Sequence, residues 1–299
     1  MIIIKVMGGL GNQLQQYALY RKFVRLGKEA RLDLSWFSDS KEQGTVLARR
    51  ELELAYFDRL VYEVCTPEEK AALVGRDDLL GKLRRKLLPF TVHSFEESRM
   101  YHEELLTFEN MYISGYFACE KYYADILYDL REKIQFPPSN NPLNREMAER
   151  MQNENSVSLH IRRGDYLDKE NAAMFGNICT DAYYEKAVSL IKKEIPDAHF
   201  YVFSDDIPYV KTKYCGGDCT AVDINHGRSS FYDIWLMSNC KHNICANSTF
   251  SFWGARLNPN ENKVMIRPTI QKNSQVFVKE EMDDLWQGWK FISPQGKIM

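Results

Sequence analysis

In the C-terminal half of the chain, segments typical of short strands alternate with segments typical of helices, and this alternation constrains the fold most strongly. The expected strands are 156–161, 199–204, 220–224, 243–246 and 263–267, and the expected helices between them are 181–194, 206–213, 229–240 and 249–257. Strands connected through helices run parallel, and a parallel sheet is covered by helices on both faces. The pattern therefore predicts an α/β domain over residues 151–299.

The chain begins with a second pattern of the same kind. Residues 2–7 are rich in isoleucine, Gly8–Asn12 form a glycine turn, and a helical stretch leads to a strand at 30–34. This is a βαβ unit. We assign residues 1–150 to an N-terminal α/β domain, because the segment 137–155 is rich in proline and asparagine. The last helix of the chain is a candidate to pack back on this domain.

Charge and composition exclude several classes of protein. The chain has 39 Lys and Arg against 41 Asp and Glu, without the basic excess typical of nucleic-acid partners. No stretch has the roughly 18 uncharged apolar residues of a membrane-spanning helix. Seven scattered cysteines imply no disulfide framework, and the close pair Cys215 and Cys219 lacks the further ligands of a zinc site. We expect a cytoplasmic protein without a metal site, at most loosely associated with the inner membrane surface through the basic segment 82–86.

The glycine turn is the first candidate for a ligand site. A glycine turn before a helix lets the backbone approach a phosphate, and the helix N-terminus offers N–H groups and partial positive charge. Gly9 and Gly11 match the start of the dinucleotide fingerprint, but Leu14 replaces its third glycine. Asp33 lies where a ribose-binding acid would be. An NAD(P)-dependent oxidoreductase, a turn without a ligand and a ligand contact through Asn12 all remain open.

A stronger candidate lies at the end of the strand 156–161. This strand carries His160, Arg162 and Arg163 to its carboxyl end, and Asp165 follows. The carboxyl ends of parallel strands border the ligand crevice, and two guanidinium groups suit a pyrophosphate. Asp165 can orient an arginine or accept a proton. A structural Arg–Asp pair is the alternative.

Acidic residues supply a third set of candidates. Ser204, Asp205 and Asp206 end the next strand, where they can accept hydrogen bonds from sugar or ribose hydroxyls or can cap the following helix. Asp233 is a lone acid on an apolar helix. A carboxylate there can pair with the N1–H and N2–H groups of guanine, or can simply belong to the first turn of the helix.

Asn247, Ser248 and Thr249 lie between an apolar run and a helical stretch. Hydroxyl groups beside the N–H groups of a helix N-terminus repeat the anion-binding arrangement. We expect these three residues to contact a phosphate.

Four motifs together resemble the bacterial α-1,2-fucosyltransferases of glycosyltransferase family 11. They are Gly-Gly-Leu-Gly-Asn-Gln at 8–13, His-x-Arg-Arg-x-Asp at 160–165, Ser-Asp-Asp at 204–206 and Ala-Asn-Ser-Thr-Phe-Ser-x-Trp at 246–253. The resemblance implies a GT-B fold, in which two Rossmann-like domains face a cleft. It also implies a GDP-β-L-fucose donor bound by the C-terminal domain, a galactose-terminated oligosaccharide or surface glycan as acceptor, inversion to an α-1,2 link, and no metal or other cofactor.

The resemblance implies binding roles as well. Arg162 matches the arginine that holds the β-phosphate of GDP, with Arg163 completing the motif, and Asp233 matches an acid that reads guanine in more distant fucosyltransferases. Three further positions match groups that face the donor: Asn12, Ser248 and Thr249. One departure is that Leu14-Gln15 stand where the family more often has Met-Phe.

Catalysis is assigned to Arg162, His160 and Asp165. A metal-free transfer must neutralise the charge of the leaving GDP with arginine and helix dipoles. Asp165 is the first candidate for the base that deprotonates the acceptor hydroxyl, with Asp168 and Glu170 as alternatives. An oxocarbenium-like path with little need of a base also remains open, as does a non-catalytic GDP-sugar-binding protein.

Overall fold

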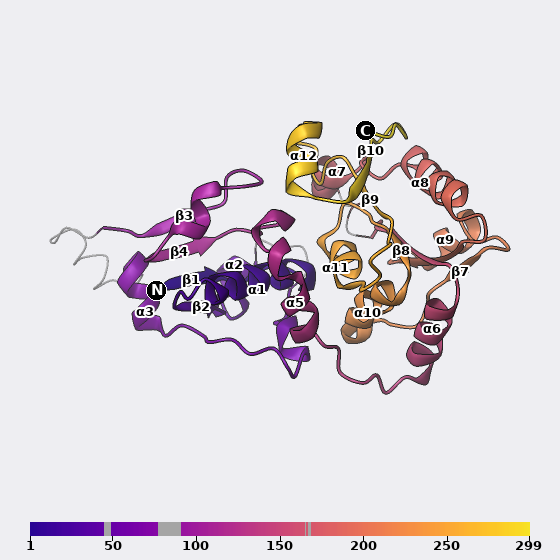
Figure 1. The fold of residues 1–299 in the computed structure, drawn as a ribbon. Coiled ribbons are helices and arrows are strands. Elements are labelled where there is room, and N and C mark those ends of the chain that lie inside the picture. Colours follow the sequence, from indigo (N-terminus) through magenta and orange to yellow (C-terminus); the bar gives the residue numbers. More distant parts are fainter. Residues whose placement is uncertain (45–48, 77–90, 165, 167–168) are drawn as a thin grey trace. The chain divides into compact units, whose positions relative to one another are not determined.

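The computed structural model describes residues 1–299 except 45–48, 77–90, 165 and 167–168. The chain divides into two compact units, Met1–Gln135 and Phe136–Met299. Each unit contains a parallel β-sheet and helices (Figure 1), so the predicted α/β class is confirmed. The cleft between two domains stays a prediction, and the basic segment 82–86 lies outside the described residues.

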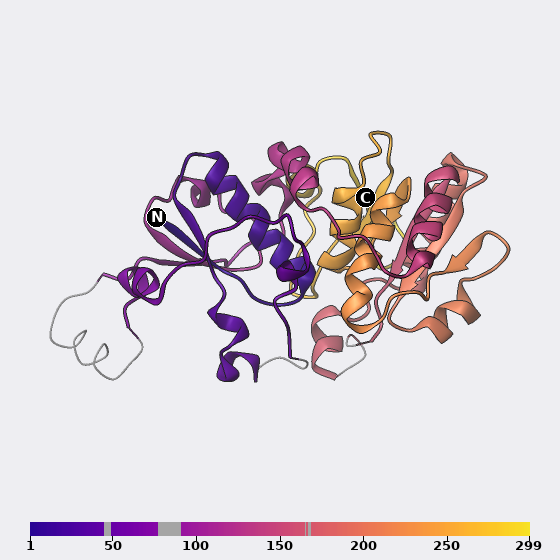
Figure 2. The same ribbon diagram turned by 90° about the horizontal axis from the view of Figure 1, so that it is seen from below.

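The first unit is built on a four-stranded sheet in the order β2-β1-β4-β3. Its strands and α-helices are β1 (Ile2–Lys5), α1 (Leu10–Arg25), β2 (Ala30–Asp33), α2 (Ser40–Gln43), α3 (Pro67–Val74), β3 (Ser94–Glu96), β4 (Met111–Ser114) and α5 (Leu127–Lys133). The three isoleucines of β1 are completely buried because this strand pairs on both sides. Helix α1 lies along the sheet (Figure 2), so β1, α1 and β2 form the predicted βαβ unit.

The second unit is built on a six-stranded parallel sheet in the order β10-β9-β8-β5-β6-β7. Its strands are β5 (Ser156–Ile161), β6 (His199–Ser204), β7 (Cys219–Ala221), β8 (His242–Ile244), β9 (Met265–Pro268) and β10 (Trp289–Ile292). Its α-helices are α6 (Pro142–Asn153), α7 (Lys169–Phe175), α8 (Asp181–Glu194), α9 (Ile207–Lys213), α10 (Tyr232–Asn239), α11 (Thr249–Leu257) and α12 (Lys279–Leu285). The five predicted strands and four predicted helices are all present, with ends that differ by at most three residues.

The division after Gln135 differs from the expected boundary at residue 150. Helix α6 therefore belongs to the second unit, although most of it was assigned to the first domain. Its buried side chains explain the difference, because Ala148 and Met151 pack with Leu236 and Met237 of α10. The expected contact of the last helix with the N-terminal domain stays a prediction.

The second sheet has a switch point between the neighbouring strands β5 and β8. β5 pairs with β6 on one side and with β8 on the other. From β5 the chain adds β6 and β7 on one side, and it then adds β8, β9 and β10 on the other side. The order in which strands are added therefore reverses between β5 and β8. Ligands of open α/β sheets bind at such a switch point, outside the carboxyl ends of the strands. The residues after β5 and β8 therefore define where to look for a site.

Candidate functional site

The glycine turn of the first unit is held by internal hydrogen bonds. Gln13 is completely buried, and its Nε2 donates to the carbonyl oxygens of Gly8 and Glu51, each at 2.9 Å. Its Oε1 accepts from the backbone N–H of Glu53 at 2.9 Å and of Leu54 at 3.2 Å. Gln13 therefore fastens the 51–54 segment to the turn.

Close packing explains one glycine of this turn. Gly8 has a φ of +81°, and a Cβ atom on it would lie 2.7 Å from Nδ2 of Asn12. The candidate residues Gly9 and Gly11 lie beside it, Gly9 as the N-cap of α1 and Gly11 buried within the first turn. The geometry brings Gly9, Gly11 and Asn12 together at one helix N-terminus.

Two buried acids of the first unit, the ribose-type candidate Asp33 and also Glu53, are engaged internally. Asp33 is buried, accepts a hydrogen bond from the Tyr112 hydroxyl at 2.7 Å and forms an ion pair with Lys70 at 2.8 Å. These contacts lower the pKa of Asp33 against the opposing effect of burial. The carboxyl of Glu53 lies at the backbone N–H of Leu10, and burial raises its pKa. An internal acid thus occupies the position that a phosphate would take at α1.

In the second unit, Asp205 organises the segment that follows β5. Its Oδ2 lies 2.9 Å from Nη1 of Arg162. Its Oδ1 accepts from the backbone N–H of Arg163 at 2.9 Å and of Gly164 at 3.0 Å. A Cβ atom on Gly164 would lie 2.5 Å from the same carboxylate, so only glycine fits this close approach. Arg162 is therefore held in place by a neighbouring strand end.

Arg163 is held by a different set of partners. Its Nε donates to Asp206 Oδ2 at 3.1 Å, and its guanidinium lies 3.6 Å from the centre of the Tyr209 ring. Asp206 also caps α9, because its Oδ1 accepts from the backbone N–H of Tyr209, and its own N–H donates to the Ser204 hydroxyl at 3.0 Å. Of the two roles predicted for these acids, Asp206 has that of a helix cap, and the Ser204 hydroxyl accepts a hydrogen bond from the backbone N–H of Asp206.

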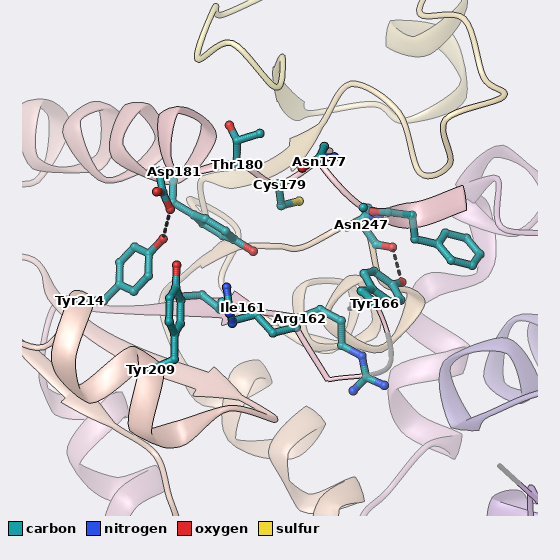
Figure 3. A pocket seen from close by; sticks show the side chains of 14 residues that line it. Ile161, Arg162, Tyr166, Asn177, Cys179, Thr180, Asp181, Tyr209, Tyr214 and Asn247 are labelled. Carbon is teal, nitrogen blue, oxygen red and sulfur yellow. Dashed lines mark hydrogen bonds between the residues drawn. The ribbon is translucent and has the colours of Figure 1, made fainter. Parts of the chain in front are cut away.

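A cavity of about 310 Å³ opens at the switch point. Three predicted residues line it, namely Arg162, Arg163 and Asn247. Figure 3 shows Arg162, Tyr166 and Asn247 on one side and Asp181, Tyr209 and Tyr214 on the other. Further lining residues come from 175–180 and from Tyr184. The cavity combines guanidinium, amide, hydroxyl and aromatic groups, a set that can bind a polar ligand with planar parts.

Asn247 anchors the far side of this cavity. Its Nδ2 donates to the carbonyl oxygens of Phe175 at 3.0 Å and Gln271 at 3.1 Å, and its own carbonyl accepts from the Tyr166 hydroxyl at 3.0 Å. The Tyr166 ring stacks on Phe175 with centres 5.1 Å apart. Asn247 therefore fixes the loop that follows β8 and leaves Ser248 as the N-cap of α11.

Ser248 and Thr249 occupy the start of α11 as expected. Both are partly exposed, and the Ser248 side chain makes no capping hydrogen bond to α11. His160, from the end of β5, packs beside this helix with its ring 5.9 Å from that of Phe250. Burial and the nearby charge of Arg162 lower the pKa of His160 to about 3, so this imidazole is neutral near pH 7.

The structure places Asp233 away from the cavity lining. Asp233 Oδ1 accepts from Nδ2 of Asn225 at 2.8 Å, and Asn225 exchanges two hydrogen bonds with Asn144 of α6. Burial raises the pKa of Asp233 to about 7. Its neighbours Tyr232 and Trp235 line a second cavity of about 440 Å³. The predicted guanine reader thus belongs to a polar network between α6 and α10.

The three predicted candidates for the base follow Arg163 in the sequence. Asp165 and Asp168 lie outside the described residues, and only the backbone of Glu170 is described, within α7. Among the described residues, no group of three or more His, Cys, Asp or Glu side chains is arranged to hold a metal ion. No helix in the described ranges has the length and apolar character needed to cross a membrane.

Several cavity residues were missed at the sequence level. Tyr166, Asn177, Thr180, Tyr209 and Tyr214 come from loops or helix ends and form no contiguous motif. A positive φ of 58° at Asn177 accompanies a tight turn, which asparagine tolerates better than most residues. Only the tertiary structure brings these residues to the end of β5.

Comparison with known proteins identifies the family. The family model described as glycosyl transferase family 11 matches residues 90–293, which is more than half of the chain. The chain belongs to glycosyl transferase family 11. This assignment agrees with the resemblance of the four motifs and does not support the oxidoreductase alternative.

Two relatives match over most of their length. The chain is 31% identical over 287 residues to the O-antigen biosynthesis glycosyltransferase WbnK of Escherichia coli, covering 87% of this chain and 91% of that protein. It is 29% identical over 283 residues to an α-1,2-colitosyltransferase of Escherichia coli, covering 90% and 91%. A solved structure of an Arabidopsis thaliana FUT1 mutant in complex with GDP is 12% identical, with a TM-score of 0.43 and coverage of 90% of this chain and 71% of that chain.

Proposed function

We propose that the protein transfers L-fucose from GDP-β-L-fucose to the 2-hydroxyl of a terminal galactoside, with inversion and without a metal ion. The observation that carries the proposal is Arg162, which Asp205 holds at the switch point of the second sheet. Membership of family 11 supports the class of reaction.

Charge on the leaving group is the main demand of this reaction. When the bond between fucose and the β-phosphate breaks, GDP leaves with additional negative charge, which a preorganised positive group stabilises. Arg162 supplies that charge, and the N–H groups at the start of α11 beside Ser248 and Thr249 supply partial positive charge. Asp205 keeps Arg162 in place before the donor arrives, so little reorganisation is needed.

The acceptor must lose a proton as its 2-hydroxyl attacks the anomeric carbon. We assign this step to Asp165, with Asp168 and Glu170 as alternatives, because all three belong to the segment that follows Arg162 and Arg163. Backside attack by the hydroxyl converts the β-linked donor to an α-linked product. His160 is neutral and buried beside α11. We assign it a role in positioning the segment that begins with Arg162.

The decisive experiment measures GDP release from GDP-fucose with and without lactose, in parallel with and without EDTA. We expect release that depends on lactose and is unchanged by EDTA, with an α-1,2 linkage in the product by NMR. Donor binding without any turnover would identify a non-catalytic GDP-sugar-binding protein. Loss of activity in EDTA that magnesium restores would contradict the metal-free mechanism.

A second donor is worth testing because one relative is named an α-1,2-colitosyltransferase. The same assay with a GDP-linked colitosyl donor separates the two sugars. Faster transfer of the colitosyl group than of the fucosyl group would overturn the donor assignment and leave the reaction class intact.

A further inference from the structure

Two cysteines lie side by side next to the candidate site. Cys215 follows α9 after one residue, and Cys219 begins the edge strand β7. Their sulfur atoms are 2.9 Å apart. The intervening glycines, Gly216 and Gly217, are exposed and have no neighbouring atoms where a Cβ would lie. The two glycines of this turn are therefore not packed against neighbouring side chains.

The backbone holds both thiols in this arrangement. The N–H of Cys215 donates to the Val210 carbonyl of α9 at 3.2 Å, and the N–H of Cys219 donates to Gly216 at 3.2 Å. Cys219 also pairs with Phe200 across the sheet. Both side chains are partly exposed, so a small reagent can reach them. In contrast, Cys119, Cys240 and Cys245 are buried.

We propose that Cys215 and Cys219 form a reversible disulfide, with a small-molecule disulfide such as oxidised glutathione as the oxidant. The thiolate of one cysteine attacks the glutathione disulfide and releases one reduced glutathione, which leaves a mixed disulfide on the protein. The second cysteine then attacks the protein sulfur and releases the second glutathione. Two protein thiols are oxidised, one glutathione disulfide is reduced, and both thiol protons pass to the released glutathione.

The two thiols are equivalent in exposure and lie in contact. Either thiol can therefore attack the reagent first, and the other then resolves the mixed disulfide. Because the second step occurs within one short turn, it is much faster than a second encounter with glutathione.

The disulfide would fasten the end of α9 to β7 beside the candidate cavity. Tyr214, directly before Cys215, donates from its hydroxyl to Asp181 Oδ1 at 3.2 Å, and both residues line the cavity. The Tyr214 ring also lies 6.0 Å from that of Tyr209, which stacks on Arg163. The disulfide itself does not rest on the proposed fucosyl transfer, because it depends only on the two thiols.

Peptide mass spectrometry tests the disulfide directly. Cleavage after Lys213 and Arg228 yields one peptide that holds both cysteines and no other cysteine. The folded, full-length protein is incubated with a large excess of oxidised over reduced glutathione, quenched in acid, alkylated and digested. We expect this peptide to lose both alkylation sites and two hydrogen atoms, and to regain both sites after reduced glutathione. A peptide that stays doubly alkylated, while its cysteines are alkylated readily in the folded protein, would overturn the proposal.

Single substitutions test whether each thiol resolves a mixed disulfide at the other. In Cys219→Ser the mixed disulfide cannot be resolved, so we expect glutathione to accumulate on Cys215. In Cys215→Ser we expect glutathione to accumulate on Cys219 for the same reason. Cys65 is also partly exposed and is a free cysteine outside this pair, so it serves as the internal reference and should remain alkylated. Equal glutathione attachment to Cys215, Cys219 and Cys65 would show that the pair has no special reactivity and would contradict the proposal.

Discussion

Asp205 determines the local geometry of the candidate site more than any other single side chain described. One carboxylate oxygen accepts from two consecutive backbone N–H groups, and the other pairs with Arg162. Both members of the ion pair are partly exposed, with side-chain exposures of 29% for Arg162 and 24% for Asp205. Such a pair contributes little to stability in solvent. Its value lies in orienting Arg162 before a phosphate binds.

Arg162→Ala should reduce fucosyl transfer about 100- to 1,000-fold, because a preorganised charge on the leaving group is lost. Steady-state rates of GDP release with lactose measure the effect. Arg162→Lys keeps the positive charge but loses the planar fork of donors, so its transfer rate should lie between those of the wild type and Arg162→Ala. An alanine variant that retains more than about a tenth of wild-type transfer would remove Arg162 from its assigned role.

Asp205→Asn should lower the transfer rate by about 100-fold while the protein stays folded, because a misplaced Arg162 no longer meets the phosphate. The matched control is Asp206→Asn, which alters the neighbouring acid that holds Arg163. Rates for both variants at saturating donor, together with their thermal unfolding, make the comparison. Equal rate losses in the two variants would show that Asp205 has no special part in positioning.

At the scale of elements, α1 contains three buried glutamines, Gln13, Gln15 and Gln16, and they differ in how their amides are bonded. Gln13 makes four hydrogen bonds that join the glycine turn to the 51–54 segment. Gln15 is also completely buried, but neither its Oε1 nor its Nε2 has a hydrogen-bond partner among the described residues. A buried amide without partners costs stability, whereas a fully bonded one supports it. Gln16 resembles Gln13, because its Oε1 accepts from the N–H of Met7 at 3.0 Å and its Nε2 donates to the Gly115 carbonyl at 2.9 Å. Of these three glutamines, Gln15 is the one with an unbonded amide.

Gln13→Leu should destabilise the protein by about 3 kcal/mol, because it leaves four backbone groups of the turn without their partner. Gln15→Leu should be neutral or stabilising by up to about 1 kcal/mol, because it removes an unpaired buried amide of similar volume. Urea unfolding of the two variants provides the measurement. A larger loss of stability in Gln15→Leu than in Gln13→Leu would contradict this interpretation of α1.

Asp233 links α10 to α6 through Asn225 and Asn144, and it gives this contact a dependence on pH. Its pKa is raised to about 7 in the folded protein from an ordinary value of 3.8. Below the ordinary value both states are protonated and nothing is lost. As the pH rises toward 7 the unfolded state ionises and the folded state does not, so the wild type loses stability.

Asp233→Asn should therefore gain stability relative to the wild type as the pH is raised from about 4 to about 7, with little further gain above that. Asparagine can still accept from Asn225, so the network is retained. Urea unfolding of both proteins at the two ends of this range measures the difference. A difference that does not change with pH would show that Asp233 is ionised in the folded protein.

At the scale of the whole molecule, the candidate site lies at the switch point of the second sheet, between β5 and β8, although the strand order of the first sheet also reverses, between β1 and β4. The cavity lining comes from the segments after β5 and β8 and from the ends of α8 and α9. The first unit also begins with a βαβ turn, but its helix N-terminus meets Glu53 and its ribose-type acid is bonded to Tyr112 and Lys70. A site in the second unit therefore predicts binding of GDP, whereas a site in the first unit would predict binding of NAD.

Calorimetric titration of the full-length protein should show binding of GDP and no binding of NAD. Arg162→Ala should weaken GDP binding by about 10-fold or more, because a charge-assisted bond to phosphate contributes on the order of 1.5–3 kcal/mol. Asp33→Asn, in the first unit, should leave GDP affinity unchanged. Binding of NAD that Asp33→Asn abolishes would overturn the assignment of the nucleotide site to the second unit.

Much of the second sheet could be predicted because its strands are buried on both faces. The six residues of β5 are all buried, and Val157, Leu159 and Ile161 alternate with polar residues in the period-two pattern that identifies a strand. β10 (Trp289–Ile292) is not among the strands predicted from the sequence, and its place at the edge of the sheet beside β9 emerges only from the tertiary structure. The domain boundary differed because the amphipathic helix α6 follows the proline-rich segment and packs against α10.

The sequence by itself determined the α/β class, the βαβ start, the family and the position of Arg162 at the end of a strand, because strand and helix periodicity and contiguous motifs are local properties. Only the tertiary structure decided which neighbours hold that arginine, because Asp205 lies 43 residues away along the chain and meets it through pairing of β5 with β6. The same holds for Tyr209, which follows Asp206 in α9, and for the internal bonding of Asp33. Side-chain partners across parallel strands depend on sheet order and register, and neither is encoded in any short stretch of sequence.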